Sequence, residues 1–355
     1  MTSTSPTTIE PTGARRRRRL PRFGPDELFI PGVLVALVVF LSLNSDVFLR
    51  TGNVLNIAAA MSLLAIVTFG QTFVIAAGGF DLSIGSQVAL HGAVGAIVMQ
   101  HTDSILAGVA VALLSGVVFG AINGLLVIWL NASPFIITLG TLVIGSGLAL
   151  VITDSRSVGG LPAGLATFGL DRPLGVPWIV WLMLACFLVA AFFLSVHTFG
   201  LKVLSTGGNR EAARLAGINV DRVTVMTFVI SGVFAAIGGL ATTARLQSAQ
   251  PTVGAQLELF AVAAVVLGGS ALHGGRAAMS RSLMGVALIS IIQNGLNLMG
   301  VEDAWQKVAV GLVFILAVAV DLLHRVVQWK GGRRTPKPAT EPTQPVTQGT
   351  PVPAG

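Results

Sequence analysis

Charged residues and cysteine are both scarce in this chain of 355 residues. Asp, Glu, Lys and Arg make up 10% of it and hydrophobic residues 53%, whereas soluble domains carry about 25% charged residues. A charge deficit along the whole length is typical of a protein that crosses a membrane several times. The single cysteine, Cys186, lies in the apolar run 178–196 and allows no internal disulfide, so we interpret it as a small core residue.

The positions of the few ionisable residues argue against nucleotide binding, metal binding and ion-coupled transport by this chain. A phosphate-binding loop needs a Gly-Lys pair, and none of the four lysines follows a glycine. The five histidines are scattered, so no metal site is predicted. Almost every acidic residue lies in a loop, a tail or at a span end, whereas ion-coupled carriers place ionisable residues inside their spans. We therefore expect no catalytic residue, no cofactor on this chain, and an energy source on another protein.

Ten apolar stretches of roughly the length that crosses hydrocarbon follow one another along the chain. They predict an all-α, polytopic bundle over residues 28–328, between a basic tail at 1–27 and a Pro/Thr-rich tail at 329–355 that we expect to be disordered. The predicted spans are 29–43, 53–76, 83–100, 105–130, 134–152, 177–196, 223–245, 257–267, 282–299 and 307–323.

The distribution of Lys and Arg predicts the orientation of these spans. If the N-terminus is cytoplasmic and the spans alternate, 17 of the 22 Lys and Arg residues fall on the cytoplasmic side and 5 on the other. This bias agrees with the positive-inside rule and predicts that both termini are cytoplasmic. It also attributes the high isoelectric point to membrane topology, so we expect no nucleic-acid partner.

Residues 78–85, Gly-Gly-Phe-Asp-Leu-Ser-Ile-Gly, place a carboxylate between two long apolar runs. We predict that the two glycines end one helix and that Asp81 caps the next by accepting a hydrogen bond from the N–H of Ser83 or Ile84. Contact with a transported solute or with a partner at the cytoplasmic face are the alternatives. Residues 268–275 share the pattern G-G-x-x-L-x-x-G, which indicates either an internal repeat or a chance likeness in a glycine-rich chain.

The segment 197–223 is the longest internal one on the expected cytoplasmic side. It predicts a short amphipathic helix with Asn209 as its N-cap, Glu211 near its positive end and Gly217 as its terminator. Such a helix is either a docking surface for a partner or a solvated loop.

Here the sequence resembles a known family. Glu211-Ala212-Ala213 followed by Gly217 resembles the E-A-A-x-x-x-G loop of ATP-binding-cassette importer permeases. Residues 78–85 resemble the G-G-[IF]-D-L-S-[VI]-G signature of permeases of the ribose, xylose, arabinose and galactose importer family. Segments 133–141, 206–220 and 266–277 also fit, although Ala-Leu-His-Gly-Gly-Arg-Ala departs slightly from the usual G-G-x-G pattern. The resemblance covers roughly residues 50–323.

The resemblance implies a multi-pass permease subunit of the plasma (inner) membrane that translocates a ribose-like monosaccharide. Its implied partners are an ATPase with two fused nucleotide-binding halves, which would hold ATP and Mg²⁺, an extracytoplasmic sugar-binding protein, and a second permease copy. The alternatives are another small ligand of this branch, such as xylose or a signalling furanose, an autonomous secondary carrier or channel, and a scaffold that moves nothing. The implied ATPase-coupling residues are Asn209, Glu211, Ala212, Ala213, Arg214 and Gly217, and the signature residues are Gly78, Gly79, Asp81, Leu82, Ser83 and Gly85.

A neutral sugar needs a path lined by uncharged hydrogen-bonding side chains, and amides suit hydroxyl groups because they both donate and accept. The alternative for each such side chain is a hydrogen bond between helices. The candidate path residues are Gln71, Asn123, Thr138, Thr141, Gln293, Asn294 and Asn297. Gly116, Gly120 and Gly124, four residues apart, instead predict a helix-packing seam.

Overall fold

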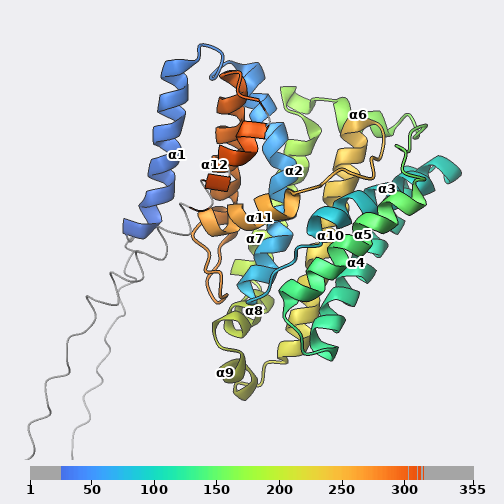
Figure 1. Cartoon of the computed structure of the whole chain (residues 1–355), viewed down its shortest axis with the longest axis vertical. Helices are drawn as coiled ribbons and strands as arrows, with labels where there is room; N and C mark the ends of the chain where they lie inside the picture. Colours follow the sequence, from blue (N-terminus) through green and yellow to red (C-terminus); the bar gives the residue numbers. More distant parts are fainter. Residues whose placement is uncertain (1–24, 303, 310, 313–314, 316–355) are drawn as a thin grey trace, which may run out of the picture.

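The computed structural model describes residues 25–302, 304–309, 311–312 and 315, and in that part of the chain it shows helices and no β-strand beyond an isolated Val158–Ala249 bridge. The helices are α1 (Pro25–Asn44), α2 (Thr51–Ala76), α3 (Ile84–Thr102), α4 (Ile105–Trp129), α5 (Pro134–Ile152), α6 (Leu165–Leu170), the 3-10 turn η1 (Pro173–Gly175), α7 (Trp178–Ser195), α8 (Thr198–Gly208), α9 (Arg210–Leu215), α10 (Val220–Leu246), α11 (Leu257–Leu267) and α12 (Met279–Leu298). The all-α prediction is confirmed (Figure 1).

Nine of the ten predicted spans coincide with helices, and the tenth, 307–323, lies largely outside the described residues. Five helices, α2, α4, α5, α7 and α10, are long and apolar enough to cross a membrane. With 11 residues, α11 is only about 16 Å long, roughly half of the hydrocarbon thickness. The prediction that 257–267 crosses the membrane on its own is therefore not supported by helix length.

The expected tails lie mostly outside the described residues, since 1–24 and 329–355 both fall there. Helix α1 already begins at Pro25, inside the segment 1–27 that we expected to be a tail. Pro fits the first turn of a helix, because the N–H that it lacks has no intrahelical partner there.

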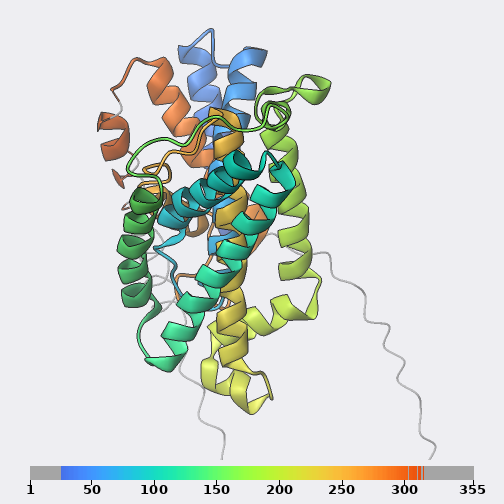
Figure 2. The same cartoon turned by 90° about the vertical axis from the view of Figure 1, so that its right-hand side faces the viewer.

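Helix α10 lies in the interior, packed by α2, α3 and α4 (Figures 1 and 2). The predicted seam on α4 is confirmed, because Gly116 lies against the Gly232 carbonyl, Gly120 against the Phe228 carbonyl and Gly124 against Val225, all on α10. A side chain at these glycines would force the two backbones apart. The single cysteine, Cys186, lies buried in the core beside α2, as expected.

The outer helices are apolar on their exposed faces. In the most apolar windows of α4, α5 and α7, less than a third of the residues are buried inside the structure, and Leu114, Leu125 and Ile144 are exposed. Apolar surface of this extent is typical of a lipid-facing or subunit-facing bundle.

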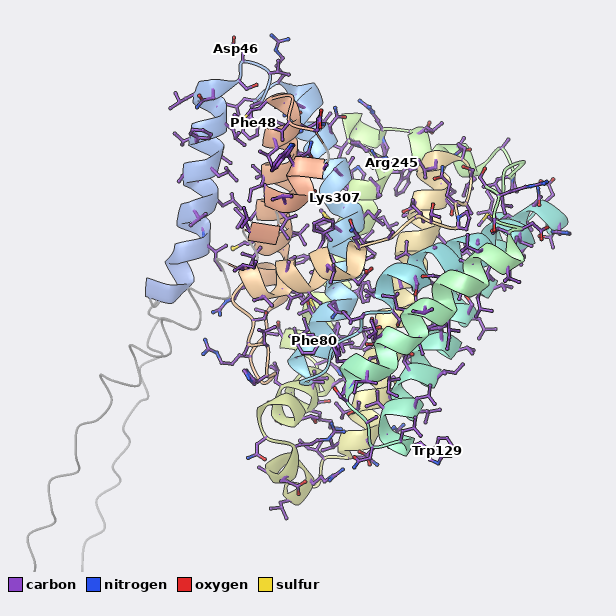
Figure 3. All side chains as sticks on the ribbon, in the orientation of Figure 1. Asp46, Phe48, Phe80, Trp129, Arg245 and Lys307 are labelled. Atoms are coloured by element: carbon purple, nitrogen blue, oxygen red, sulfur yellow. The ribbon has the colours of Figure 1, made fainter. Side chains whose placement is uncertain are left out.

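The labelled side chains show which elements lie at each end of the bundle. Trp129, at the end of α4, lies at the same end as α8 and α9, whereas Asp46 and Arg245 lie at the opposite end (Figures 1 and 3). Phe80 lies between these ends (Figure 3), and the residues that follow it, 81–85, are buried. The signature segment is thus an interior feature of the molecule rather than a surface loop.

Candidate functional site

The break between α2 and α3 is made by the two glycines, as the sequence predicts. The N–H of Gly78 bonds to the Ile75 carbonyl at 2.9 Å and that of Gly79 to the Val74 carbonyl at 2.9 Å. Gly78 has φ +84°, a conformation that strongly favours glycine. This is the Schellman pattern of a helix end, and α3 begins at Ile84, eight residues after Ala76.

Asp81 is fully buried in this break and its carboxylate receives four hydrogen bonds. Oδ1 accepts from the Ser83 N–H at 3.0 Å and from Ser83 Oγ at 2.5 Å. Oδ2 accepts from Ser231 Oγ at 2.7 Å and from Gln87 Nε2 at 3.3 Å. The predicted bond to the Ser83 N–H is confirmed, although Ser83 rather than Asp81 occupies the N-cap position.

Further side chains complete this polar network. The Gln71 amide lies against the backbone of Asp81, and in the amide orientation that matches these neighbours its nitrogen donates to the Asp81 carbonyl at 3.1 Å and its oxygen accepts from the Asp81 N–H at 3.3 Å. Asn123 Nδ2 donates to Ser83 Oγ at 2.8 Å. Four donors on one carboxylate offset much of the cost of burying its charge, although no cation contacts it in the described part of the chain.

The network continues along α3 to a histidine. His91 Nε2 lies 3.4 Å from Gln87 Oε1, and Ser115 Oγ lies 2.8 Å from His91 Nδ1. Nε2–H can donate to Gln87 Oε1, and Nδ1 shares a hydrogen bond with Ser115 Oγ, which also donates to the Ala112 carbonyl at 2.7 Å. His91 thus links α3 to α4.

The structure brings several predicted path residues together at the break. Their side chains, however, are hydrogen-bonded to other groups of the protein. Thr138 Oγ1 donates to the Pro134 carbonyl at 2.8 Å and contacts the Phe80 carbonyl at 3.2 Å, and Thr141 Oγ1 donates to the Thr138 carbonyl at 3.3 Å. Gln71, Asn123 and Thr138 thus link α2, α4 and α5 to the break, whereas the bond of Thr141 stays within α5. Of this group, Asn123 Oδ1 alone is a buried atom without a partner.

The path residues on α12 lie elsewhere. Asn294 exchanges two hydrogen bonds with Asn53 of α2, at 2.9 and 3.0 Å. Gln293 is half-buried and Asn297 is exposed. The structure therefore separates the α12 amides from those at the break, and the seven candidates do not line one cavity.

A second break follows α11 and repeats the geometry of the first. The N–H of Gly269 bonds to the Val266 carbonyl at 2.8 Å and that of Ser270 to the Val265 carbonyl at 3.2 Å, and Gly269 has φ +81°. These bonds make Gly269 the counterpart of Gly78. The repeated G-G-x-x-L-x-x-G pattern had aligned Gly78 with Gly268, so that register is wrong by one residue.

Helix α9 forms at the end of the molecule as predicted. Asn209 Oδ1 accepts from the Ala212 N–H at 2.9 Å, and Gly217, at φ +81°, ends the helix with the Schellman bond from the Ile218 N–H to the Ala213 carbonyl at 3.0 Å. Arg214 lies 3.3 Å from Glu211. The outer face exposes apolar surface, because Leu215 is 90% exposed.

Glycines connect this end to both breaks. The Gly275 N–H donates to the Ala76 carbonyl, the last residue of α2, at 3.0 Å. A Cβ on Gly207 would collide with that same carbonyl, and a Cβ on Gly274 would lie 2.7 Å from the Gly78 nitrogen. We call Gly78, Gly207, Gly274 and Gly275 the glycine junction. It places Gly207, at the end of α8 and three residues before α9, in direct contact with the end of α2 and with the segment that follows α11.

Sequence reasoning missed three participants of the network. Ser231 lies 150 residues from Asp81 in the sequence, and no local sequence pattern predicts such a contact. Gln87 had a signal, because Ser83, Gln87 and His91 recur every four residues on one face of α3. Ser115 directly precedes Gly116 on α4 and gave no separate signal. In the described residues no group of three or more potential metal ligands is present.

Comparison with known proteins gives consistent matches. Residues 53–318 match the family model described as branched-chain amino acid transport system / permease component. The ribose import permease protein of Escherichia coli (strain K12) is 40% identical over 293 residues, 81% of this chain and 90% of that protein. That of Bacillus subtilis (strain 168) is 40% identical over 291 residues, with the same two shares. The D-allose transport system permease protein of Escherichia coli is 37% identical over 83% of this chain and 90% of its own. No solved structure matches the chain.

Proposed function

This chain belongs to the family of branched-chain amino acid transport system permease components, and we propose that it is the membrane-spanning permease subunit of an ATP-binding-cassette importer for a monosaccharide. The observation that carries the proposal is the 40% identity to ribose import permeases over 81% of the chain. The chain is a multi-pass protein of the plasma (inner) membrane, because it combines this family with five helices able to span a membrane.

The energy for uphill transport comes from a partner in this proposal. The chain lacks a Gly-Lys phosphate-binding loop, so ATP and Mg²⁺ belong to an ATPase subunit, for which we propose two fused nucleotide-binding halves. Helix α9 is its docking element. Its exposed Leu215 offers apolar contact area, and the preceding helix α8 meets the end of α2 and the segment after α11 at the glycine junction. Movement of α9 on the ATPase would therefore reach both breaks.

The remaining partners follow from the same proposal. An extracytoplasmic sugar-binding protein delivers the monosaccharide, and a second copy of this chain completes the translocation path, with lipid around both. The exposed apolar faces of α4, α5 and α7 support this arrangement. The charge bias supports ten spans and cytoplasmic termini, with α8 and α9 at the cytoplasmic end.

Uptake measurements test the proposal. Cells that express the chain should import one of D-ribose, D-allose or L-arabinose, and deletion of the chain should abolish this uptake. Depletion of ATP should stop the uptake, whereas a protonophore applied at constant ATP should not. Uptake that follows the proton gradient instead would contradict the proposal and favour an autonomous carrier.

A further inference from the structure

A cavity of about 260 Å³ opens between α3, α5 and the segment that connects α10 to α11. None of the predicted path residues lines it. Its polar lining residues are Ser86, Ser146, Thr252, Gln256 and Glu258. Typical pockets for drug-sized ligands measure about 300–1,000 Å³, so this cavity suits one small ligand rather than an extended chain.

The cavity lies near the middle depth of the bundle. Asp81 contacts Ser231, which lies 11 residues after Val220 in the 27-residue α10, or about 16 Å along a helix of about 40 Å. Gly85, in the first turn of α3, packs directly against Gly254 of the connecting segment. This segment therefore returns from the end that carries Arg245 to the depth of the break (Figures 1 and 3).

The connecting segment is not helical between Gln247 and Gln256. Irregular backbone at membrane depth is tolerated where protein buries it or where it lines a water-filled cavity. Thr252, Ala255 and Gln256 are exposed, so the second condition applies to them. Transport proteins commonly place solute sites at such interrupted helices near mid-depth.

Glu258 gives the cavity a carboxylate. A Cβ on Gly85 would collide with the Glu258 carboxylate, which therefore lies at the first turn of α3, the positive end of that helix. The carboxylate also faces the backbone N–H groups of Gln256 and of Glu258 itself. The ion pairs found among the described residues join Arg210 and Arg214 to Glu211 and Asp221 and leave Glu258 without a cation. An intramembrane carboxylate of this kind is costly and usually serves function.

The other polar groups are available to hydroxyl groups of a ligand. Ser86 Oγ donates to the Ser83 carbonyl at 2.8 Å and Ser146 Oγ to the Leu142 carbonyl at 2.9 Å. Their protons are thus engaged and their lone pairs can accept. The Gln256 amide can donate, and Ala89 and Leu142 provide apolar wall. A polyhydroxylated ring has this combination of hydroxyl donors, acceptors and C–H faces.

We propose that this cavity binds the monosaccharide during translocation, with Glu258 and Ser146 accepting hydrogen bonds from its hydroxyl groups; this inference rests on the proposed function. The bound sugar then lies beside Ser86, which is in the first turn of α3, close to the buried break. A change at the glycine junction can then alter the cavity through α2 and α3.

The test uses the full chain in its host membrane and the sugar of the panel that the wild type imports fastest. Glu258→Gln removes the charge and Ser146→Leu fills the cavity. Each should lower uptake per membrane-resident chain by about tenfold or more, the first because a charge-assisted hydrogen bond to the sugar is lost and the second because leucine occupies the space of the sugar. The matched controls Glu302→Gln and Ala110→Leu, at exposed positions, should stay within about twofold of wild type.

A thiol at the site separates sugar binding from a structural effect. Ser146→Cys should react with a small thiol reagent, and sugar supplied during ATP-driven transport should slow this reaction, while the buried Cys186 provides a silent background. Normal uptake by both cavity variants, or no protection by sugar in a chain that transports it, would overturn the cavity assignment and leave the proposed function intact. A wild type that imports none of the three sugars would overturn both.

Discussion

Asp81 shows how a charge is kept inside this molecule. Its carboxylate has four donors from Ser83, Ser231 and Gln87 and no exposed surface. Ser83, Ser231 and Gln87 each use Asp81 as a hydrogen-bond acceptor. We therefore assign Asp81 to holding the break between α2 and α3 in one geometry against α10.

Replacing Asp81 tests this assignment. Asp81→Ala leaves the Ser231 and Ser83 hydroxyls without their acceptor, and we expect a loss of about 1–3 kcal/mol in stability. The amount of monodisperse protein in size-exclusion chromatography of detergent extracts should fall. Asp46→Ala, at an exposed position, is the control and should have little effect. Normal abundance of Asp81→Ala with lost uptake would instead assign Asp81 to transport.

At this scale the sequence predicts local partners and misses distant ones. The glycine termination, the Ser83 N–H bond and the Asn209 cap all lie within five residues of their partners, so composition and spacing predict them. The Ser231 contact joins residues 150 positions apart. Glu258 was not predicted as a site residue. An acidic residue in the first turn of a short apolar helix looks, in the sequence, like the ordinary end of a span.

Two helical glycines allow a prediction about the packing of elements, because one lies in the seam between α4 and α10 and the other lies outside it. A Cβ on Gly120 would collide with the Phe228 backbone, whereas a Cβ on Gly140 would meet nothing within 4 Å. Gly120→Ala should therefore destabilise by about 1–3 kcal/mol through forced displacement of the helices. Gly140→Ala should be neutral or stabilise by about 0.5–1 kcal/mol. Thermal unfolding of the two purified variants measures both signs, and equal effects would refute the seam.

Helix α9 allows a prediction about coupling. Gly217 has φ +81° and open space around it. Gly217→Arg should abolish sugar uptake without removing the chain from the membrane, because a bulky charge would block docking of the ATPase. Gly217→Asn is the control for backbone strain, since Asn tolerates this conformation at a helix end, and it should retain uptake. Full uptake with Gly217→Arg would exclude α9 as the coupling element.

Element lengths explain where span prediction succeeded and where it failed. Long apolar runs predicted α2, α4, α5 and α10 within a few residues. The short run at 257–267 also appeared as a span, because composition does not show that a polar connecting segment re-enters the bundle before it. The second break was predicted one residue out of register, because Gly268 and Gly269 are adjacent and only the hydrogen bonds show which one has positive φ.

At the scale of the whole molecule, the two most exposed leucines in the described part of the chain allow a test of orientation. Leu215 and Leu174 are each 90% exposed, on α9 and in η1, which lies in the connection between α5 and α7. A membrane-impermeant maleimide should label Leu174→Cys in intact cells and Leu215→Cys only in opened membranes. The native Cys186 is buried and should give no background. The opposite labelling pattern would invert the topology that the charge bias predicts.

In our proposal a partner ATPase drives sugar transport through this chain. Affinity purification of the tagged chain from native membranes in mild detergent, followed by mass spectrometry, shows whether this partner binds. We expect an ATPase with two nucleotide-binding halves to co-purify with the wild type and with Gly217→Asn, and to be lost with Gly217→Arg. A folded wild-type chain that reproducibly emerges alone would refute the ATPase-driven mechanism and leave an autonomous carrier as the better explanation.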